Sequence, residues 1–225
     1  MTRCASEDRH PTEGLGWRAP NPVPTRIDTP RLTIRLARLD EIAHCASVIA
    51  DNIDHLHPWM LWARGVHANP ASLYKFIAEQ HLGIDSPATL KELGLGVFLR
   101  DSDRLIGGSG IHDIRPDTAS AETGYWIAKP HVGKGFAEEA CRHLLSWAFR
   151  SPADGGMGLR RIRIYCSSAN KPSARIPEKL GLTAEVRQRQ DYFVEGHGPT
   201  DRLGWGVLAD EWDCQRHEVT ARPAT

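Results

Sequence analysis

The stretch Tyr125-Trp-Ile-Ala-Lys-Pro-His-Val-Gly-Lys-Gly-Phe-Ala-Glu-Glu-Ala140 decides how this 225-residue chain folds. Its first residues are typical of a strand, its middle is a short turn with Gly133 and Gly135, and its end begins a helix. From Phe136 to Phe149, apolar residues recur as adjacent pairs every four residues, which makes one continuous apolar stripe. The two glycines therefore stand at the N-terminus of a helix whose axis is fixed by packing.

This glycine-containing turn has the features of a pyrophosphate-binding site. The first N–H groups of a helix have no partner within the helix and carry partial positive charge. Gly133 and Gly135 let the backbone approach a ligand, because no Cβ stands in the way. A Gly-x-Gly pair is weak by itself, since it is neither a Walker loop nor a full GxGxxG motif. A glycine-rich turn before a surface helix is the alternative.

The hydrophobic pattern of the chain predicts a mixed sheet with helices packed on it. Seven strands are expected, at Arg31–Leu36, Gly94–Leu99, Leu105–Ile111, Ala121–Ala128, Arg160–Cys166, Val186–Phe193 and Arg202–Leu208. Helices are expected from Asp40 onward and at Leu73–Leu82, Phe136–Phe149 and Pro172–Leu180. Some strands follow one another as hairpins and others alternate with helices, which indicates an α/β (α+β) fold.

The composition argues against several classes of protein. The chain has 28 Lys+Arg and 28 Asp+Glu residues, and this balance disfavours a protein that mainly grips nucleic acid or an anionic membrane. No apolar run reaches the roughly 18–20 residues that span a bilayer. The first 25 residues lack the apolar core of a secretory signal. The five cysteines show no metal-ligand spacing. We expect reduced thiols, no metal and a cytoplasmic location.

One domain is expected between two flexible ends. Residues 1–26 contain several prolines and glycines that break regular elements, so this segment is expected to be a flexible arm. Trp17 is the group that would pin this arm to the body. Residues 27–213 form the domain, and residues 214–225 form a polar tail that is expected to fray.

Val132-Gly-Lys-Gly-Phe-Ala137 and five further segments, in one order along the chain, resemble the GCN5-related N-acetyltransferases (GNAT), and in particular their RimJ/RimL-type branch. Segment Val132-Gly-Lys-Gly-Phe-Ala137 is similar to their acetyl-CoA loop, whose pattern is Gln/Arg-x-x-Gly-x-Gly/Ala. Val132 replaces the Gln or Arg, which removes a side-chain contact but keeps the backbone amides. The other matching segments are Thr29–Arg35, His55–Ala63, Ala121–Ile127, Ala169–Leu182 and Asp210–Trp212. The Ile176-Pro-Glu-Lys-Leu180 variant is similar to ribosomal-protein-serine acetyltransferases.

The resemblance implies a GNAT fold, with a mostly antiparallel sheet of about seven strands that splays at its middle and carries helices on both faces. It implies acetyl-CoA as the cofactor. The diphosphate would bind the backbone of Val132, Gly133, Lys134, Gly135, Phe136 and Ala137. The backbone of Trp126 and Ile127 would pair with the pantetheine amides like an extra strand. Asn170 would either touch the pantetheine arm or only cap the following helix.

Two residues are candidates for proton transfer. Strand alternation places Glu122 on one face with Gly124 and Trp126. The resemblance implies a carboxylate base near the acceptor amine at this strand, acting directly or through water; a solvated strand glutamate is the alternative. Ser173 is the candidate acid for the leaving thiolate, and a first-turn helix cap is its alternative. Pro177 follows Ser173 by one turn and lacks an amide donor, so it frees the Ser173 carbonyl.

The acceptor side of the site has three candidates. Trp59 and Trp62 are three residues apart, so on a helix they would share a face and wall the acceptor cleft. A plain core role is the alternative for both tryptophans. His112, at the end of a predicted strand, is a candidate contact to the acceptor.

The function expected is therefore acetyl transfer from acetyl-CoA to a primary amine by direct attack in a ternary complex. A protein N-terminal α-amine is favoured, as in ribosomal-protein acetyltransferases, because its pKa of about 7.7–8.0 leaves part of it neutral at physiological pH. A small amine such as a polyamine, an aminoglycoside or an amino-acid conjugate is the alternative acceptor. A non-catalytic acyl-CoA-binding module is the alternative of another class. The resemblance also leaves a homodimer open.

Overall fold

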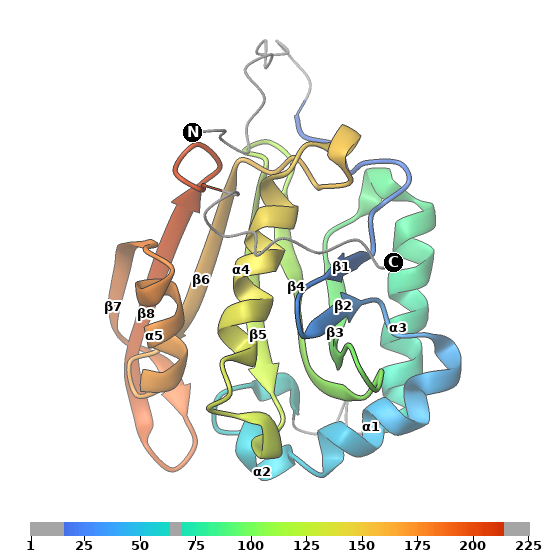
Figure 1. Ribbon diagram of the computed structural model, residues 1–225. Coiled ribbons are helices and arrows are strands. Elements are labelled where there is room, and N and C mark those ends of the chain that lie inside the picture. Colours follow the sequence, from blue (N-terminus) through green and yellow to red (C-terminus); the bar gives the residue numbers. More distant parts are fainter. Residues whose placement is uncertain (1–15, 64–68, 214–225) are drawn as a thin grey trace.

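A single sheet of eight strands organises the part of the chain that the computed structural model describes, residues 16–63 and 69–213 (Figure 1). The strands are β1 (Arg26–Asp28), β2 (Leu32–Arg35), β3 (Leu93–Leu99), β4 (Leu105–Arg115), β5 (Ser120–Ile127), β6 (Arg161–Ser167), β7 (Thr183–Val194) and β8 (Gly198–Leu208). Their order across the sheet is β1-β2-β3-β4-β5-β6-β8-β7. Every neighbouring pair is antiparallel except β5 and β6, so the predicted mixed, mostly antiparallel sheet is confirmed.

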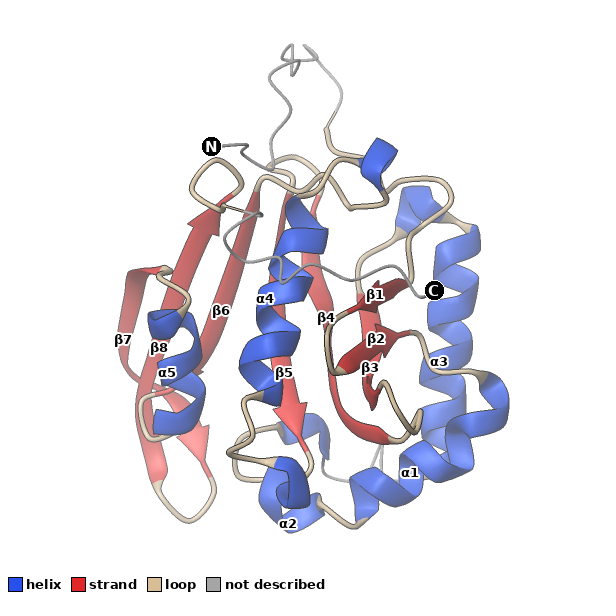
Figure 2. Ribbon diagram, viewed as in Figure 1, coloured by secondary structure: helices blue, strands red, loops and turns tan. Residues whose placement is uncertain are grey.

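Helices cover both faces of this sheet. They are α1 (Ile42–Ala50), α2 (Ile53–Leu56), α3 (Pro70–Asp85), α4 (Phe136–Phe149) and α5 (Lys171–Lys179). In Figure 2, α4 lies in front of β5 and α5 lies in front of β8. Helices α1 and α3 form a separate cluster with the sheet, in which Ile49 and Ile77 pack with Phe98 and Leu105. Each face of the sheet therefore has its own apolar cluster.

The main core lies between α4 and the sheet. Leu144 and Leu145 of α4 are fully buried there, together with Ile106 of β4 and Ile162 of β6. Each such side chain stabilises the fold by about 1.5–3 kcal/mol relative to an exposed one. The bounds of α4 are those predicted from its apolar stripe. This packing fixes the position of the α4 N-terminus, and the turn that contains Gly133 and Gly135 comes directly before it.

Strands β5 and β6 separate part-way along their length. They pair in parallel only from Ser120 to Glu122, against Arg161 to Arg163. Among the described strands, the rest of β5 pairs with β4 only, while β6 continues along β8. The predicted splay is confirmed, and beyond Glu122 one edge of β5 faces the gap.

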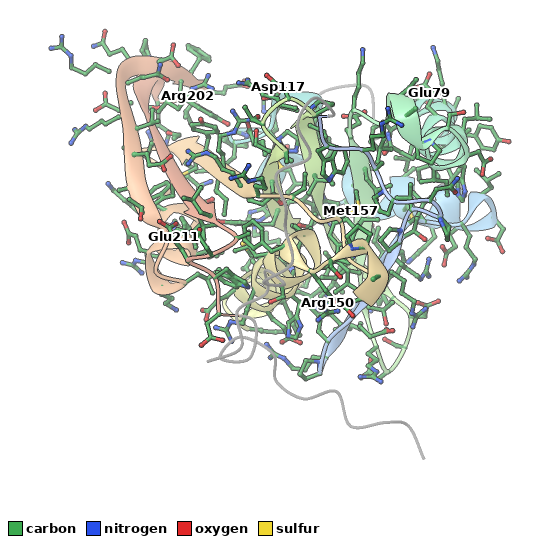
Figure 3. The ribbon with its side chains drawn as sticks, turned by 90° about the horizontal axis from the view of Figure 1, so that it is seen from above. Glu79, Asp117, Arg150, Met157, Arg202 and Glu211 are labelled. Atoms are coloured by element: carbon green, nitrogen blue, oxygen red, sulfur yellow. The ribbon has the colours of Figure 1, made fainter. Side chains whose placement is uncertain are left out.

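The two ends of the sheet carry different elements. Seen from above, the β7–β8 hairpin, marked by Arg202, and helix α3, marked by Glu79, lie at opposite ends of the molecule (Figure 3). None of the helices in the described ranges combines the length and apolarity that crossing a membrane requires.

Part of the N-terminal segment is docked, which corrects the expectation of a flexible arm up to residue 26. The Trp17 indole donates a hydrogen bond to Met157 O at 2.8 Å, and its backbone N–H donates to Pro116 O at 2.7 Å. Val23 is buried in the main core. Strand β1 is the eighth strand and was not predicted, because it has three residues of which only Ile27 is buried. Residues 1–15 and 214–225 lie outside the described residues.

Candidate active site

The turn before α4 presents a set of backbone donors. Gly133 and Gly135 have φ values of +76° and +80°, a left-handed conformation that glycine adopts without strain. Within the described ranges, the amides from Gly133 to Ala137 donate to no other group. The Val132 N–H differs, because it donates to Lys129 O at 3.4 Å. Of the six predicted donors, from Val132 to Ala137, the Val132 N–H therefore already has a backbone partner.

Arg31, from the β1–β2 turn, lies beside these donors. Its Nη1 donates to Lys134 O at 3.0 Å, and its guanidinium stacks 4.6 Å from the centroid of the Phe136 ring. A Cβ added at Gly135 would lie 3.5 Å from Arg31 Nη2. Glu139 holds the Arg31 side chain through an Oε2–Nε contact of 2.6 Å. A cation from a distant segment thus stands at the N-terminus of α4.

Further positive charge gathers at the same end of α4. The pKa of His131 is lowered by its partial burial and by the nearby charges of Lys134 and Arg104. His131 also packs against Phe136, with ring centroids 6.3 Å apart. Free amides and clustered cations together suit a ligand with several negative charges, such as a diphosphate.

Glu122 stands where β5 and β6 separate. It pairs with Arg163 in the last rung that joins the two strands, and with His112 across β4 and β5. Its Oε1 lies 3.1 Å from Nε2 of His112, and both side chains are partly exposed. The structure therefore brings two of the predicted site residues, Glu122 and His112, into contact at the start of the gap.

The free edge of β5 runs from this carboxylate toward the turn before α4. Trp126 and Ile127 lie in the part of β5 that pairs only with β4 among the described strands. Their backbone borders the gap, which is the position that the sequence analysis predicted for an added strand. The Trp126 side chain points to the α1/α3 face, where it lies against Gly108 and packs with Trp62 at a centroid distance of 6.1 Å.

Helix α5 forms the other side of the gap. Asn170 caps it, because the Asn170 side chain accepts a hydrogen bond from Ser173 N at 3.2 Å. The capping group is therefore Asn170, and the Ser173 hydroxyl is not used as a cap. That hydroxyl interacts with the thiol of Cys166 on β6. Burial raises the pKa of Cys166 to about 11, so this thiol is neutral near pH 7.

A tyrosine joins the two sides of the gap. Tyr125 of β5 donates a hydrogen bond from its hydroxyl to Ser173 O of α5 at 3.0 Å. That carbonyl is available because Pro177 has no N–H to bond it within the helix, as the sequence predicted. Pro177 indicated from the sequence that this carbonyl has no partner within the helix, but the sequence did not indicate that Tyr125 would bond it.

An apolar cavity of about 460 Å³ lies on the α1/α3 face of the sheet. Its floor is formed by glycines of β3, β4 and β5, and its walls include Trp62, Phe76 and Trp126. His112 lies on its lining, so the cavity reaches the Glu122–His112 pair. Trp62 is among the residues that line this cavity, and its role beside an acceptor stays a prediction.

Trp59 occupies a different place from the one predicted. It does not line the cavity; its ring stacks on His197 of the β7–β8 turn at a centroid distance of 6.4 Å. Its carbonyl accepts a hydrogen bond from the Tyr192 hydroxyl at 2.7 Å. The two tryptophans do not share a helical face, because α2 ends at Leu56 and the chain turns before Leu61. Trp59 instead ties the segment after α2 to the β7–β8 hairpin.

Comparison with known proteins decides the family. Residues 31–183 match the family model described as the acetyltransferase (GNAT) domain. The chain belongs to the GNAT acetyltransferase family. It is 28% identical over 186 residues to the "Putative ribosomal N-acetyltransferase YdaF" of Bacillus subtilis, and the match covers 82% of this chain and 95% of that protein. The chain is thus an acyltransferase, and its resemblance to the RimJ/RimL-type branch is confirmed.

Solved GNAT structures share this architecture. RimL, the ribosomal L7/L12 alpha-N-protein acetyltransferase, solved in complex with coenzyme A, superposes with a TM-score of 0.71 at 18% identity, over 83% of this chain and 99% of RimL. The microcin C7 self-immunity acetyltransferase MccE, solved with acetyl-CoA and AMP, gives 0.67 at 20% identity, over 80% of this chain and 93% of MccE. At these identities the likeness shows the GNAT fold.

Proposed function

We propose that this GNAT enzyme transfers an acetyl group from acetyl-CoA to a primary amine, and that its acceptor is the N-terminal α-amine of a protein. The observation that carries the proposal is the place of the Glu122–His112 pair. It lies at the start of the gap between β5 and β6, with the free amides of Gly133 to Ala137 toward the other end of β5 and the apolar cavity beside it on the α1/α3 face. The name of the relative YdaF supports a protein acceptor.

The residues of the gap suit coenzyme A. The free amides from Gly133 to Ala137, with Arg31 beside them, would hold the diphosphate, and the free edge of β5 at Trp126 and Ile127 would pair with the pantetheine amides. When bound, acetyl-CoA supplies a thioester whose acetyl carbon accepts the amine. Ser173 and Asn170 lie on the α5 side of the same gap.

Glu122 acts as the base in this proposal. An α-amine has a pKa of about 7.7–8.0, so a substantial fraction is neutral near pH 7.5. Attack by the neutral amine leaves an extra proton on the nitrogen, and this proton passes to Glu122, directly or through water. His112 orients the carboxylate through its Nε2 contact. The Ser173 hydroxyl would donate a proton to the departing sulfur and then regain a proton from solvent. The new bond joins the acetyl carbon to the amine nitrogen, and the bond from that carbon to sulfur breaks.

Acetyl transfer from acetyl-CoA to peptides and to small amines, followed by release of the free thiol and by mass spectrometry of the product, tests the proposal. We expect peptides with a free N-terminus to be acetylated and N-terminally blocked peptides to be inert. Glu122→Gln should lower kcat about 100-fold with little change in the KM for acetyl-CoA. Glu79→Gln, on the exposed side of α3 at the far end of the sheet, is the matched control. Transfer to polyamines but not to peptides would refute the protein acceptor.

A further inference from the structure

The apolar cavity is separate from the proposed coenzyme site. It is bounded by α1, α3, the Met60–Trp62 segment and one face of β3, β4 and β5, and neither α4, β6 nor α5 contributes to its lining. The proposed coenzyme site uses the other side of β5 and the N-terminus of α4. The cavity can therefore hold an acceptor group while the coenzyme is bound.

A row of glycines in register creates this space. Gly94, Gly110 and Gly124 stand side by side on adjacent strands, and so do Gly96 and Gly108 in the next row, beside Trp126. Residues in register on neighbouring strands share a face, so five side chains are missing from this part of one face. Aromatic rings cover part of it, because a Cβ at Gly94 would meet Phe76 and a Cβ at Gly108 would meet Trp126. A Cβ at Gly124 would meet only His112 Cε1, at 3.8 Å, so Gly124 opens onto free space.

The walls of the cavity are apolar and aromatic. They include Ile49, Met60, Trp62, Phe76, Ile77 and Trp126. Cys45 also lines it, and burial raises the pKa of that thiol to about 11, so it adds no charge near pH 7. The buried amide of Gln80 nearby is already paired, since it accepts from Gly94 N at 2.9 Å and donates to Glu92 at 3.3 Å. Glu92 and Ser109 also line the cavity, and the Ser109 hydroxyl donates to Gly124 O at 2.9 Å. The walls are therefore mostly apolar and suit an apolar group.

One end of the cavity is polar, and it is the end where the chemistry is proposed. His112 lines it and contacts Glu122. An amine held at this pair places the substituent on its neighbouring carbon in the cavity. A serine or alanine side chain would leave most of a 460 Å³ space unfilled, whereas a cavity of this size suits a large apolar group.

We propose that the acceptor amine lies next to a bulky apolar side chain, so that the enzyme prefers protein N-termini that begin with a large apolar residue such as Phe or Leu. This inference rests on the proposed function, because it assigns the side-chain pocket of the same acceptor site. The glycine rows set the depth of the pocket, and Trp62, Phe76 and Trp126 set its aromatic character.

The experiment compares peptides that are identical except for a first residue of Phe, Leu, Ala or Ser, together with phenylalanine amide as a small amine. We expect kcat/KM for the Phe and Leu peptides to exceed that for the Ser peptide at least 10-fold. Gly124→Val fills the floor and should lower the Phe-to-Ala ratio of kcat/KM at least 5-fold. Gly83→Val, in α3 and outside the cavity lining, is the matched control and should keep the ratio.

The outcomes separate the inference from the proposed function. Equal or better turnover of the Ser and Ala peptides would overturn the inference and leave the proposed function standing. If phenylalanine amide is acetylated and none of the peptides is, the protein acceptor is overturned and the apolar side-chain pocket is supported. If no amine is acetylated, calorimetric binding of the same peptides to the enzyme with coenzyme A decides the matter. Tighter binding of the Phe peptide that Gly124→Val abolishes supports the pocket, and equal binding of all peptides overturns it.

Discussion

The hydroxyl of Tyr125 donates a hydrogen bond to the carbonyl oxygen of Ser173 at 3.0 Å, across the gap in the sheet. Tyr125 belongs to β5 and Ser173 to α5, which follows β6, and β5 and β6 no longer pair at this level. Burial raises the pKa of Tyr125 well above its usual value, so its hydroxyl stays protonated and remains a donor near pH 7. This bond sets the position of Ser173 relative to the free edge of β5.

Tyr125→Phe should destabilise the protein by about 1–3 kcal/mol, because it leaves the Ser173 carbonyl without a partner. Pro177→Ala supplies an N–H that can bond this carbonyl within the helix, so it should reduce the cost of Tyr125→Phe. The measurement is urea unfolding of the two single variants and the double variant, read as a double-mutant cycle. Strictly additive effects would show that Pro177 does not control this carbonyl.

Gly135→Ala should weaken coenzyme A binding at least 10-fold. The φ of +80° at this position costs an alanine roughly 1–2 kcal/mol, and relief of that strain would turn the amides of the α4 N-terminus. Gly155→Ala is the matched control, since Gly155 has a φ of +75° in the turn after Pro152 and its added Cβ meets nothing. Both variants should lose similar stability, and only Gly135→Ala should lose affinity in calorimetry. If the two variants bind coenzyme A with equal affinity, these amides do not take part in its binding.

Arg31→Ala should raise the Kd for coenzyme A about 3- to 10-fold at low salt, and less at high salt, because an exposed cation acts over a range that salt shortens. Arg26→Ala, which removes an exposed arginine paired with Asp28 on β1, is the control and should leave the Kd unaltered. A Kd that is independent of Arg31 at both salt concentrations would limit its role to packing on Phe136.

The carboxylate of Glu139 should make stability fall in acid. Burial would raise its pKa, but hydrogen bonds from Thr29 and from the backbone and side chain of Arg31 outweigh burial and hold the pKa below its usual value. A depressed pKa gives stability that is complete above the unfolded value, about pH 4.3, and is lost as the pH falls through the folded value.

Glu139→Gln should therefore cost about 1–3 kcal/mol at pH 7 and much less at pH 3. Urea unfolding at both pH values measures this difference, with Glu79→Gln as the control for loss of an exposed charge. An equal cost at pH 3 and pH 7 would mean that the ionised carboxylate adds nothing to the Thr29 and Arg31 contacts.

Sequence periodicity was sufficient where a segment is long and its pattern is regular. The apolar stripe of α4 predicted both ends of the helix, and the alternation at residues 160–166 predicted strand β6 to within one residue at each end. Strand β1 was missed because a single buried residue in a proline-rich segment produces no hydrophobic periodicity. The docking of Trp17 was expected, but its partner Met157 could not be named, because it lies 140 residues away.

The same distinction holds for the candidate site. Glu122 and His112 could be named from strand positions, but their contact depends on the register of β4 and β5. Arg31 gave no local signal, since its place depends on Glu139, which is 108 residues away. Trp59 was misplaced because its stacking on His197 needs the β7–β8 turn. Strand register and long-range contacts arise only in the folded structure, so they could not be predicted from a single sequence.

The glycine-lined face of β3, β4 and β5 also bears on how readily the enzyme could be engineered. Leu95, Ile111 and Ile127, on the same three strands, belong to the core beneath α4. A mutation such as Gly124→Ala alters the shape of the cavity without touching that core or the turn before α4. Under the proposed function, such a change would redirect the choice of amine and leave the binding of the acetyl donor intact.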